Sequence, residues 1–228
     1  MKLIRKYIIY SLLFVCSAFA GLHAQTSPRM WLGVHGGVDI GTFSFDPAPP
    51  NNVFSSKTGF AAGGEFDYWF SNNFGVCYQA SYVQKGFREK DQVNISFTFP
   101  YIQVPILFKA TIGNGSFKPV IFFGPEIGFR LSATATGPGN NRADTTITFP
   151  DSLFTKTNFG IMVGAGITYN LNPTTLFFLS AAYDYGVSNL NPNFGKSQFG
   201  SSSNNDKWYT RDIRMSLGVL IAIEKSGE

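Results

Sequence analysis

Apolar and polar residues alternate with a period of two over long parts of this chain. Phe74, Val76 and Tyr78 alternate with Gly75 and Cys77, and the pattern recurs through residues 159–170 and 213–224. Strict alternation predicts β-strands and does not fit helical spacing. Eight such segments lie near 30–41, 57–70, 73–88, 98–112, 116–134, 154–170, 174–188 and 208–224. They exceed the usual strand length of about 5–6 residues, as tilted membrane strands of about 9–11 residues with protruding ends would.

The connections between these segments alternate in length. Three are tight turns rich in Asn, Gly and Pro, at 71–73, 113–115 and 171–173. The others are long and polar, at roughly 42–56, 89–97, 135–153 and 189–207. Bacterial outer-membrane barrels have short periplasmic turns and longer extracellular loops. We therefore predict an all-β fold, an eight-stranded antiparallel up-and-down transmembrane β-barrel with short periplasmic turns and long extracellular loops.

The N-terminus has the features of a secretory signal. Lys2, Arg5 and Lys6 precede a short apolar run at 8–16, and small residues lead to a cleavage site after Ala24, with Ala20 as the alternative. The run is short for a membrane-spanning helix of about 20 residues, which is the alternative. We expect a signal peptide at 1–24, an outer-membrane β-barrel domain at 25–228, and location in the outer membrane.

Charged residues make up 14% of the chain, whereas about 25% is usual in soluble domains. Removing the three basic residues of the signal leaves 18 − 3 = 15 Lys and Arg against 14 Asp and Glu. With no basic stripe left, we expect no nucleic-acid partner. Cys77 is the only cysteine after residue 24 and His35 the only histidine, so we expect no disulfide, no metal site and no cofactor.

The alternation places most of the strand charges on one face. On segment 116–134 the apolar face includes Ile121 and Phe123, and the opposite face carries Lys118, Glu126 and Arg130. A barrel of eight strands is narrow enough to be filled by side chains, and enclosed charges must be paired. We therefore predict a plugged, salt-bridged lumen; a proton or ion path is the alternative. The predicted polar network comprises Asp39, Glu65, Asp67, Lys85, Lys109, Glu126, Arg130, Asp184 and Arg214, with Lys118 and Glu224 also directed inward.

Aromatic residues cluster near the ends of the segments. We expect them to form girdles at the two membrane interfaces, although aromatic residues could also fill a soluble core. The predicted girdle residues are Trp31, Tyr68, Trp69, Phe70 and Phe74 at the periplasmic rim and Phe87, Phe99, Tyr101, Tyr185, Trp208 and Tyr209 at the outer rim. Because proline cannot donate to a β-ladder, Pro105 predicts a bulge in the fourth segment.

Several stretches resemble the PorT-like outer-membrane β-barrel family of small Bacteroidetes-type barrels. They are residues 31–37 (WLGVHGG), 79–87 (QASYVQKGF), 101–107 (YIQVPIL) and 123–128 (FGPEIG), and the likeness spans nearly the whole mature chain. The resemblance implies an eight-stranded outer-membrane barrel and no particular activity. Many outer-membrane barrels end on an aromatic residue that the insertion machinery reads, whereas this chain ends in EKSGE.

These features predict a barrel with a structural or surface-binding role and no enzymatic activity. A narrow transport channel and a soluble lipocalin-like binding barrel are the alternatives. The expected partners are outer-membrane lipid, the insertion machinery and an extracellular or periplasmic protein. Because His35 lies in the first segment, near the periplasmic side, we interpret it as a structural contact of Asp39 rather than as a catalytic base.

Overall fold

A computed structural model describes residues 29–46, 54–90, 94–113, 115–138, 144–190 and 207–223. These residues form ten β-strands. The strands are β1 (Arg29–Asp46), β2 (Phe54–Trp69), β3 (Phe74–Glu89), β4 (Ile95–Thr111), β5 (Phe117–Arg130), β6 (Thr134–Pro138), β7 (Asp144–Thr148), β8 (Thr157–Asn172), β9 (Thr175–Gly186) and β10 (Lys207–Ala222). The predicted signal segment 1–24 and Glu224 lie outside the described residues.

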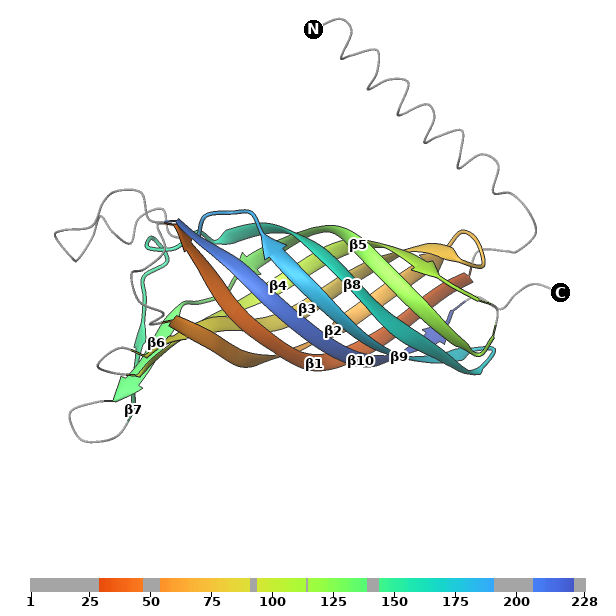
Figure 1. Cartoon of the computed structure of the whole chain (residues 1–228), viewed down its shortest axis with the longest axis horizontal. Helices are drawn as coiled ribbons and strands as arrows, with labels where there is room; N and C mark the ends of the chain where they lie inside the picture. Colours follow the sequence, from red (N-terminus) through yellow and green to blue (C-terminus); the bar gives the residue numbers. More distant parts are fainter. Residues whose placement is uncertain are drawn as a thin grey trace, which may run out of the picture.

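Eight of the ten strands close into a barrel (Figure 1). Each strand pairs antiparallel with its neighbour in the order β1-β2-β3-β4-β5-β8-β9-β10, and β10 pairs with β1 to complete the ring. Closure satisfies the backbone N–H and C=O groups within the ring, which hydrocarbon surroundings require because an unpaired group there costs several kcal/mol. The predicted all-β, up-and-down antiparallel barrel is confirmed.

The short and long connections lie at opposite ends of the barrel (Figure 1). We call these the turn end, with the β2–β3, β4–β5 and β8–β9 connections, and the loop end. Gly113 has a φ of 90° in the β4–β5 turn, a conformation that favours glycine. At the β8–β9 turn, the Asn172 side chain accepts a hydrogen bond from the Thr174 backbone N–H at 2.9 Å. Local turn chemistry therefore explains why these connections are tight.

The apolar face of each barrel strand points outward. Phe123 is 60% exposed and Leu217 is 65% exposed, whereas Glu126 and Arg214 are buried on the opposite face of their strands. A soluble lipocalin-like barrel requires the reverse arrangement, so that alternative is wrong. Among the described residues, no helix has the length and apolar character needed to cross a membrane.

The predicted fifth segment, 116–134, does not form one strand. β5 ends at Arg130, and the chain then forms a hairpin of β6 and β7 within the region that was predicted to be a loop. β6 pairs with the first residues of β4, so the hairpin extends the sheet beyond the ring at the loop end (Figure 1). The hairpin is short and rich in exposed threonine, and its strands lack the apolar face on which the prediction relied.

The predicted bulge at Pro105 is also wrong. The β3–β4 register is the same before and after the proline, with Tyr78 opposite Ile106 and Ser81 opposite Gln103. The ladder lacks partners only at Gln79 and Ala80. Since proline lacks the N–H that would donate here, the strands lose hydrogen bonds without inserting a residue.

Candidate functional site

The lumen of the barrel has three levels along its axis. An aromatic plug fills the loop end, a layer of charged side chains lies in the middle, and a cavity opens at the turn end. We treat this lumen as the candidate functional site because most of the buried polar and charged side chains of the described residues line it.

Lys85 is the centre of the middle level. Its ammonium group lies 2.6 Å from an Asp212 carboxylate oxygen and 3.9 Å from Glu126, and it donates a short hydrogen bond to Asp184. The Lys85 side chain is completely buried, as are the Asp184 and Asp212 carboxyl groups. Removing charges from water is costly, so this arrangement depends on the close pairing of Lys85 with the acids around it.

Arg214 is the second cation of this level. It donates from Nε to Asp39 at 3.3 Å and from Nη2 to the side-chain oxygen of Gln103. The Gln103 amide in turn donates to Glu126 at 2.8 Å and to Asp184 at 2.9 Å. The network is therefore continuous across the lumen.

The central charged layer comprises Asp39, Lys85, Gln103, Glu126, Asp184, Asp212 and Arg214. It contains four carboxyl groups and two cationic groups. Oxygens of all four carboxyl groups are buried without a hydrogen-bond partner among the described residues. The layer is thus richer in acidic than in basic groups.

The aromatic plug lies between the central charged layer and the loop end. Phe87 packs against Phe43 with ring centroids 4.9 Å apart and against Phe97 at 4.7 Å. Phe99 and Tyr101 are buried in the same cluster. The full plug comprises Phe43, Phe87, Phe97, Phe99, Tyr101, Ala133, Ala135, Phe154 and Leu190, with Phe45, Phe54, Ile95, Phe149, Leu153 and Trp208 packed against it.

The plug corrects the predicted aromatic girdles. Phe87, Phe99, Tyr101 and Trp208 point into the lumen rather than towards lipid. At the turn end, Trp31 is also buried in the lumen, and Trp69 packs beside it against Leu176 and Leu220. Phe74 and Tyr185 are about half exposed on the outward face. The girdle prediction assigned all of these aromatic side chains to the lipid interface. A narrow lumen also needs large side chains to fill it, and the aromatic plug supplies them.

Arg130 attaches segment 149–156 to the barrel mouth. Its guanidinium group donates to the backbone oxygens of Phe154 at 3.0 Å, Thr155 at 3.3 Å and Asp151 at 3.3 Å. This holds Phe154 in the aromatic plug, where its ring contacts that of Phe99 with centroids 5.3 Å apart. A segment from the loop region therefore helps to close the lumen.

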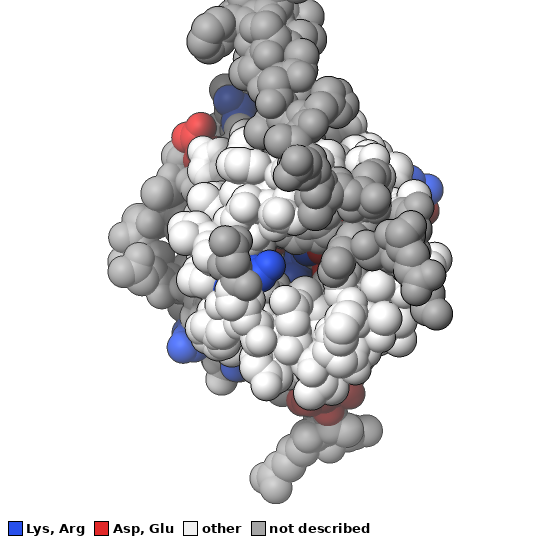
Figure 2. All heavy atoms as spheres, turned by 90° about the vertical axis from the view of Figure 1, so that its right-hand side faces the viewer, with Lys and Arg blue, Asp and Glu red and all other residues white. Residues whose placement is uncertain are grey.

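The turn end contains a cavity of about 470 Å³. Viewed from this end, the barrel has a central hollow in which basic and acidic side chains are visible within an uncharged rim (Figure 2). Its walls include Trp31, Trp69, Phe122 and Phe178, and residues of the β2–β3 and β8–β9 turns line its mouth. We call this the turn-end cavity. Its volume falls in the range of about 300–1,000 Å³ that is typical of small-molecule sites.

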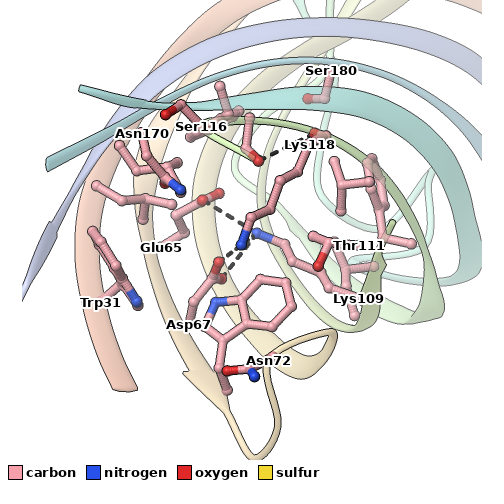
Figure 3. A pocket seen from close by; sticks show the side chains of 18 of the residues that line it. Trp31, Glu65, Asp67, Asn72, Lys109, Thr111, Ser116, Lys118, Asn170 and Ser180 are labelled. Carbon is pink, nitrogen blue, oxygen red and sulfur yellow. Dashed lines mark hydrogen bonds and ion pairs between the residues drawn. The ribbon is translucent and has the colours of Figure 1, made fainter. Parts of the chain in front are cut away.

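Charged groups line the floor of the turn-end cavity (Figure 3). The Lys109 ammonium lies 2.9 Å from both Asp67 carboxylate oxygens and 3.4 Å from Glu65. Glu65 also accepts a hydrogen bond from Gln79 at 2.8 Å. Lys118 points into the cavity from the opposite wall, and its side chain has no ion pair among the described residues.

His35 lies beside this floor and does not contact Asp39 as predicted. Its Nε2 is 2.9 Å from the Ser81 hydroxyl, and its Nδ1 is 3.6 Å from a Glu65 carboxylate oxygen. Asp39 pairs with Arg214 instead. Spacing along one strand placed His35 and Asp39 on the same face, but the partners of His35 come from β2 and β3 and the partner of Asp39 comes from β10.

The structure places the nine predicted network residues at three separate sites. Asp39, Lys85, Glu126, Asp184 and Arg214 meet in the central charged layer, and Glu65, Asp67 and Lys109 meet below it. Arg130 stands apart at the barrel mouth. The prediction missed Asp212, although it has the same alternation parity as Arg214 and could have been found.

Solved structures with a similar fold are small outer-membrane barrels. The outer membrane protein OprG of Pseudomonas aeruginosa is 18% identical and has a TM-score of 0.51, with 88% of this chain and 98% of OprG covered. The Neisserial surface protein A is 12% identical, with 86% and 98% covered and a TM-score of 0.47. No curated protein matches the sequence.

A family model described as "Outer membrane protein beta-barrel domain" matches residues 23–191. The match covers most of the chain, and the ring of tilted strands with an outward apolar face agrees with it. The chain is an outer-membrane protein, with the turn end at the periplasm and the loop end outside, and it belongs to the outer membrane protein β-barrel domain family.

Proposed function

We propose that this protein is a closed, non-conducting barrel with a structural or surface-binding role in the outer membrane. The observation that carries this proposal is the aromatic plug above the central charged layer, since the two fill successive levels of the same narrow lumen. A narrow transport channel is the alternative, and it requires a continuous water path.

Single-channel recording in planar bilayers tests the closed state. We expect the purified protein to give no steady conductance steps, because an ion would have to pass both the plug and the charged layer. Large steady conductance from the wild-type protein would contradict the proposal and favour the channel.

The β6–β7 hairpin favours surface binding over a purely structural role. Every residue of β7 is exposed. These residues include the apolar Ile147, which is 59% exposed on the cell-surface side, where it would face water and not lipid. Thr136 and Thr146 pair through their hydroxyl groups at 2.9 Å, which holds the two strands together beyond the ring. An ordered, exposed hairpin can present a surface to an extracellular protein partner.

Replacing residues 134–148 by a short turn tests this role. We expect the shortened barrel to insert and fold, because the ring does not include β6 or β7, but to lose binding of cells to extracellular proteins coated on a surface. Equal binding by both proteins would leave the structural role as the better explanation.

The proposal includes no catalysis. His35 is 8% exposed and lies inside the lumen near the turn end, so a substrate in the outer leaflet or the loops does not reach it. Membership of the PorT-like branch also belongs to this proposal. The proposed partners are lipid acyl chains against the outward face and the insertion machinery of the outer membrane.

A further inference from the structure

Three side chains of metal-ligating types meet at and just beneath the floor of the turn-end cavity, which Glu65 and Asp67 line. Ligand atoms of Glu65, Asp67 and Cys77 all lie within 4.8 Å of one another, and all three residues are buried. Cys77 is directly opposite Asp67 in the β2–β3 ladder, and Glu65 is two residues before Asp67 on the same face of β2. Two neighbouring strands therefore hold a thiol and two carboxylates in place.

His35 supplies a separate indication of a ligand. It is 8% exposed, and its Nδ1 has no hydrogen-bond partner among the described residues. That nitrogen lies 3.6 Å from Glu65 Oε2, while Nε2 contacts the Ser81 hydroxyl. A metal-bound histidine usually makes such a hydrogen bond through its other ring nitrogen, which fixes the orientation of the ring.

Lys109 currently supplies the positive charge at this cluster. Its ammonium contacts both carboxylates, so one cation stands against two acids and a thiol that can also become negative. The Lys109 side chain is 12% exposed and lines the turn-end cavity, unlike the fully buried Lys85. Lys109 can therefore turn into the cavity and leave the carboxylates to another cation.

We propose that Glu65, Asp67, Cys77 and His35 form a binding site for a divalent transition-metal cation of the Zn²⁺ type, reached from the periplasm through the turn-end cavity. One thiolate, one imidazole and two carboxylates suit a borderline-soft ion better than Mg²⁺ or Ca²⁺, which prefer oxygen alone. Ligands bonded at about 2.0–2.3 Å in a tetrahedron lie roughly 3.3–3.8 Å apart. The ligand atoms of Glu65, Asp67 and Cys77, within 4.8 Å of one another, therefore contract only modestly on binding, and the His35 ring, 3.6 Å from Glu65, moves towards them.

Binding exchanges one cation for another. Cys77 releases its thiol proton to solvent as its sulfur bonds to the metal, and Lys109 remains protonated as it moves into the cavity. The prediction of no metal site was based on the Cys and His residues alone. The site combines one of each with two carboxylates from another strand.

Cobalt(II) titration of the full mature protein in neutral detergent tests the site, because Co²⁺ substitutes for Zn²⁺ and reports thiolate bonding. We expect a thiolate-to-cobalt charge-transfer band in the near ultraviolet that excess Zn²⁺ abolishes. The band should disappear in Cys77→Ser. A band that persists in Cys77→Ser, or that is absent from a folded wild-type protein and a folded Lys109→Met variant, overturns the proposal.

Lys109→Met distinguishes metal binding at this site from metal binding elsewhere on the protein. We expect it to raise the apparent Co²⁺ affinity by about tenfold or more, because the charge-assisted hydrogen bonds of Lys109 no longer have to be broken. Lys118→Met is the matched control, since Lys118 lines the same cavity without pairing with the carboxylates, and it should leave the affinity unchanged. Equal affinity of Lys109→Met and wild type contradicts the exchange.

Thermal unfolding of the wild-type protein keeps the proposal testable if Lys109→Met does not fold. Excess Zn²⁺ should raise the wild-type unfolding temperature, since a ligand that binds only the folded state stabilises it. Equal concentrations of Mg²⁺ should not, and Cys77→Ser should lose most of the shift. Equal shifts with Zn²⁺ and Mg²⁺ would contradict the site.

Discussion

The loop half and the turn half of the lumen are built from the same strands yet filled in opposite ways. On β3, Phe87 faces the lumen at the loop end and Gly75 at the turn end. On β4, Phe99 occupies the loop half and Lys109 the turn half. The loop half is packed with rings, whereas the turn half keeps a cavity of about 470 Å³. Side-chain volume along each strand, rather than strand number, therefore decides which end of a small barrel is open.

The central charged layer, at the border between these halves, provides one of the two largest expected effects. Lys85→Met leaves the four carboxyl groups of the central charged layer with Arg214 as their only cation. Breaking a buried ion pair by removing one partner costs roughly 3–5 kcal/mol, so we expect a loss of that size in the free energy of unfolding. Urea titration in lipid vesicles, followed by the gel mobility of unboiled samples, measures it.

Asp212→Asn is the control for Lys85→Met. It removes one of the excess negative charges while keeping the shape of the side chain, so we expect a much smaller change in the free energy of unfolding. If the two variants lose the same free energy of unfolding, the excess of acidic over cationic groups does not determine how much this layer contributes to stability.

Phe87→Ala tests whether the loop half of the lumen is packed more tightly than the turn half. Phe87 is 1% exposed and central to the aromatic plug, so its removal should cost about 3–5 kcal/mol in the free energy of unfolding. Phe178→Ala, in the wall of the turn-end cavity, should cost less because its ring already borders open space. Equal losses in the same urea assay would show that the two halves are packed alike.

Arg130→Met tests how the loop half is closed. The variant loses the hydrogen bonds to the backbone oxygens of segment 149–156, which are worth roughly 1–3 kcal/mol because the donor is charged. We expect faster proteolysis within segment 149–156 while the barrel resists the protease. An unchanged cleavage rate would mean that the packing of Phe154 and the backbone hydrogen bonds of Phe149 and Thr155 hold the segment without the guanidinium group.

The smallest expected effect concerns pH. The hydrogen bond from the Lys156 ammonium, together with its charge, holds the pKa of Asp151 below the ordinary value of 3.8. Because the folded pKa is the lower one, this pair stabilises segment 149–156 above pH of about 4 and is lost as the pH falls through the folded pKa. Asp151 is exposed, so we expect limited proteolysis of the segment to change little between neutral pH and pH of about 5 and to rise slightly below that range. Asp151→Asn should abolish the pH dependence.

The alternation of the strands also indicates which aromatic residues face the lumen. Phe87 has the same parity as Lys85, and Phe99 and Tyr101 have the parity of Lys109, so all three belonged to the lumen face from the start. The prediction of a lipid-facing girdle was based on their position near the strand ends and not on their parity. The β6–β7 hairpin could not be found in this way, because each strand has only five residues, β7 is exposed throughout and β6 buries only Ala135.

The sequence by itself determined the closed barrel, its orientation in the membrane and the face on which each charge lies. A period of two fixes the face of every residue in a strand, and the lengths of the connections fix the order of the strands. Only the tertiary structure decided which charges meet, such as Lys85 with Asp212 and Arg214 with Asp39. Those contacts join strands that lie far apart in the chain or across the lumen, and they depend on strand register and tilt around the ring, which no local pattern encodes.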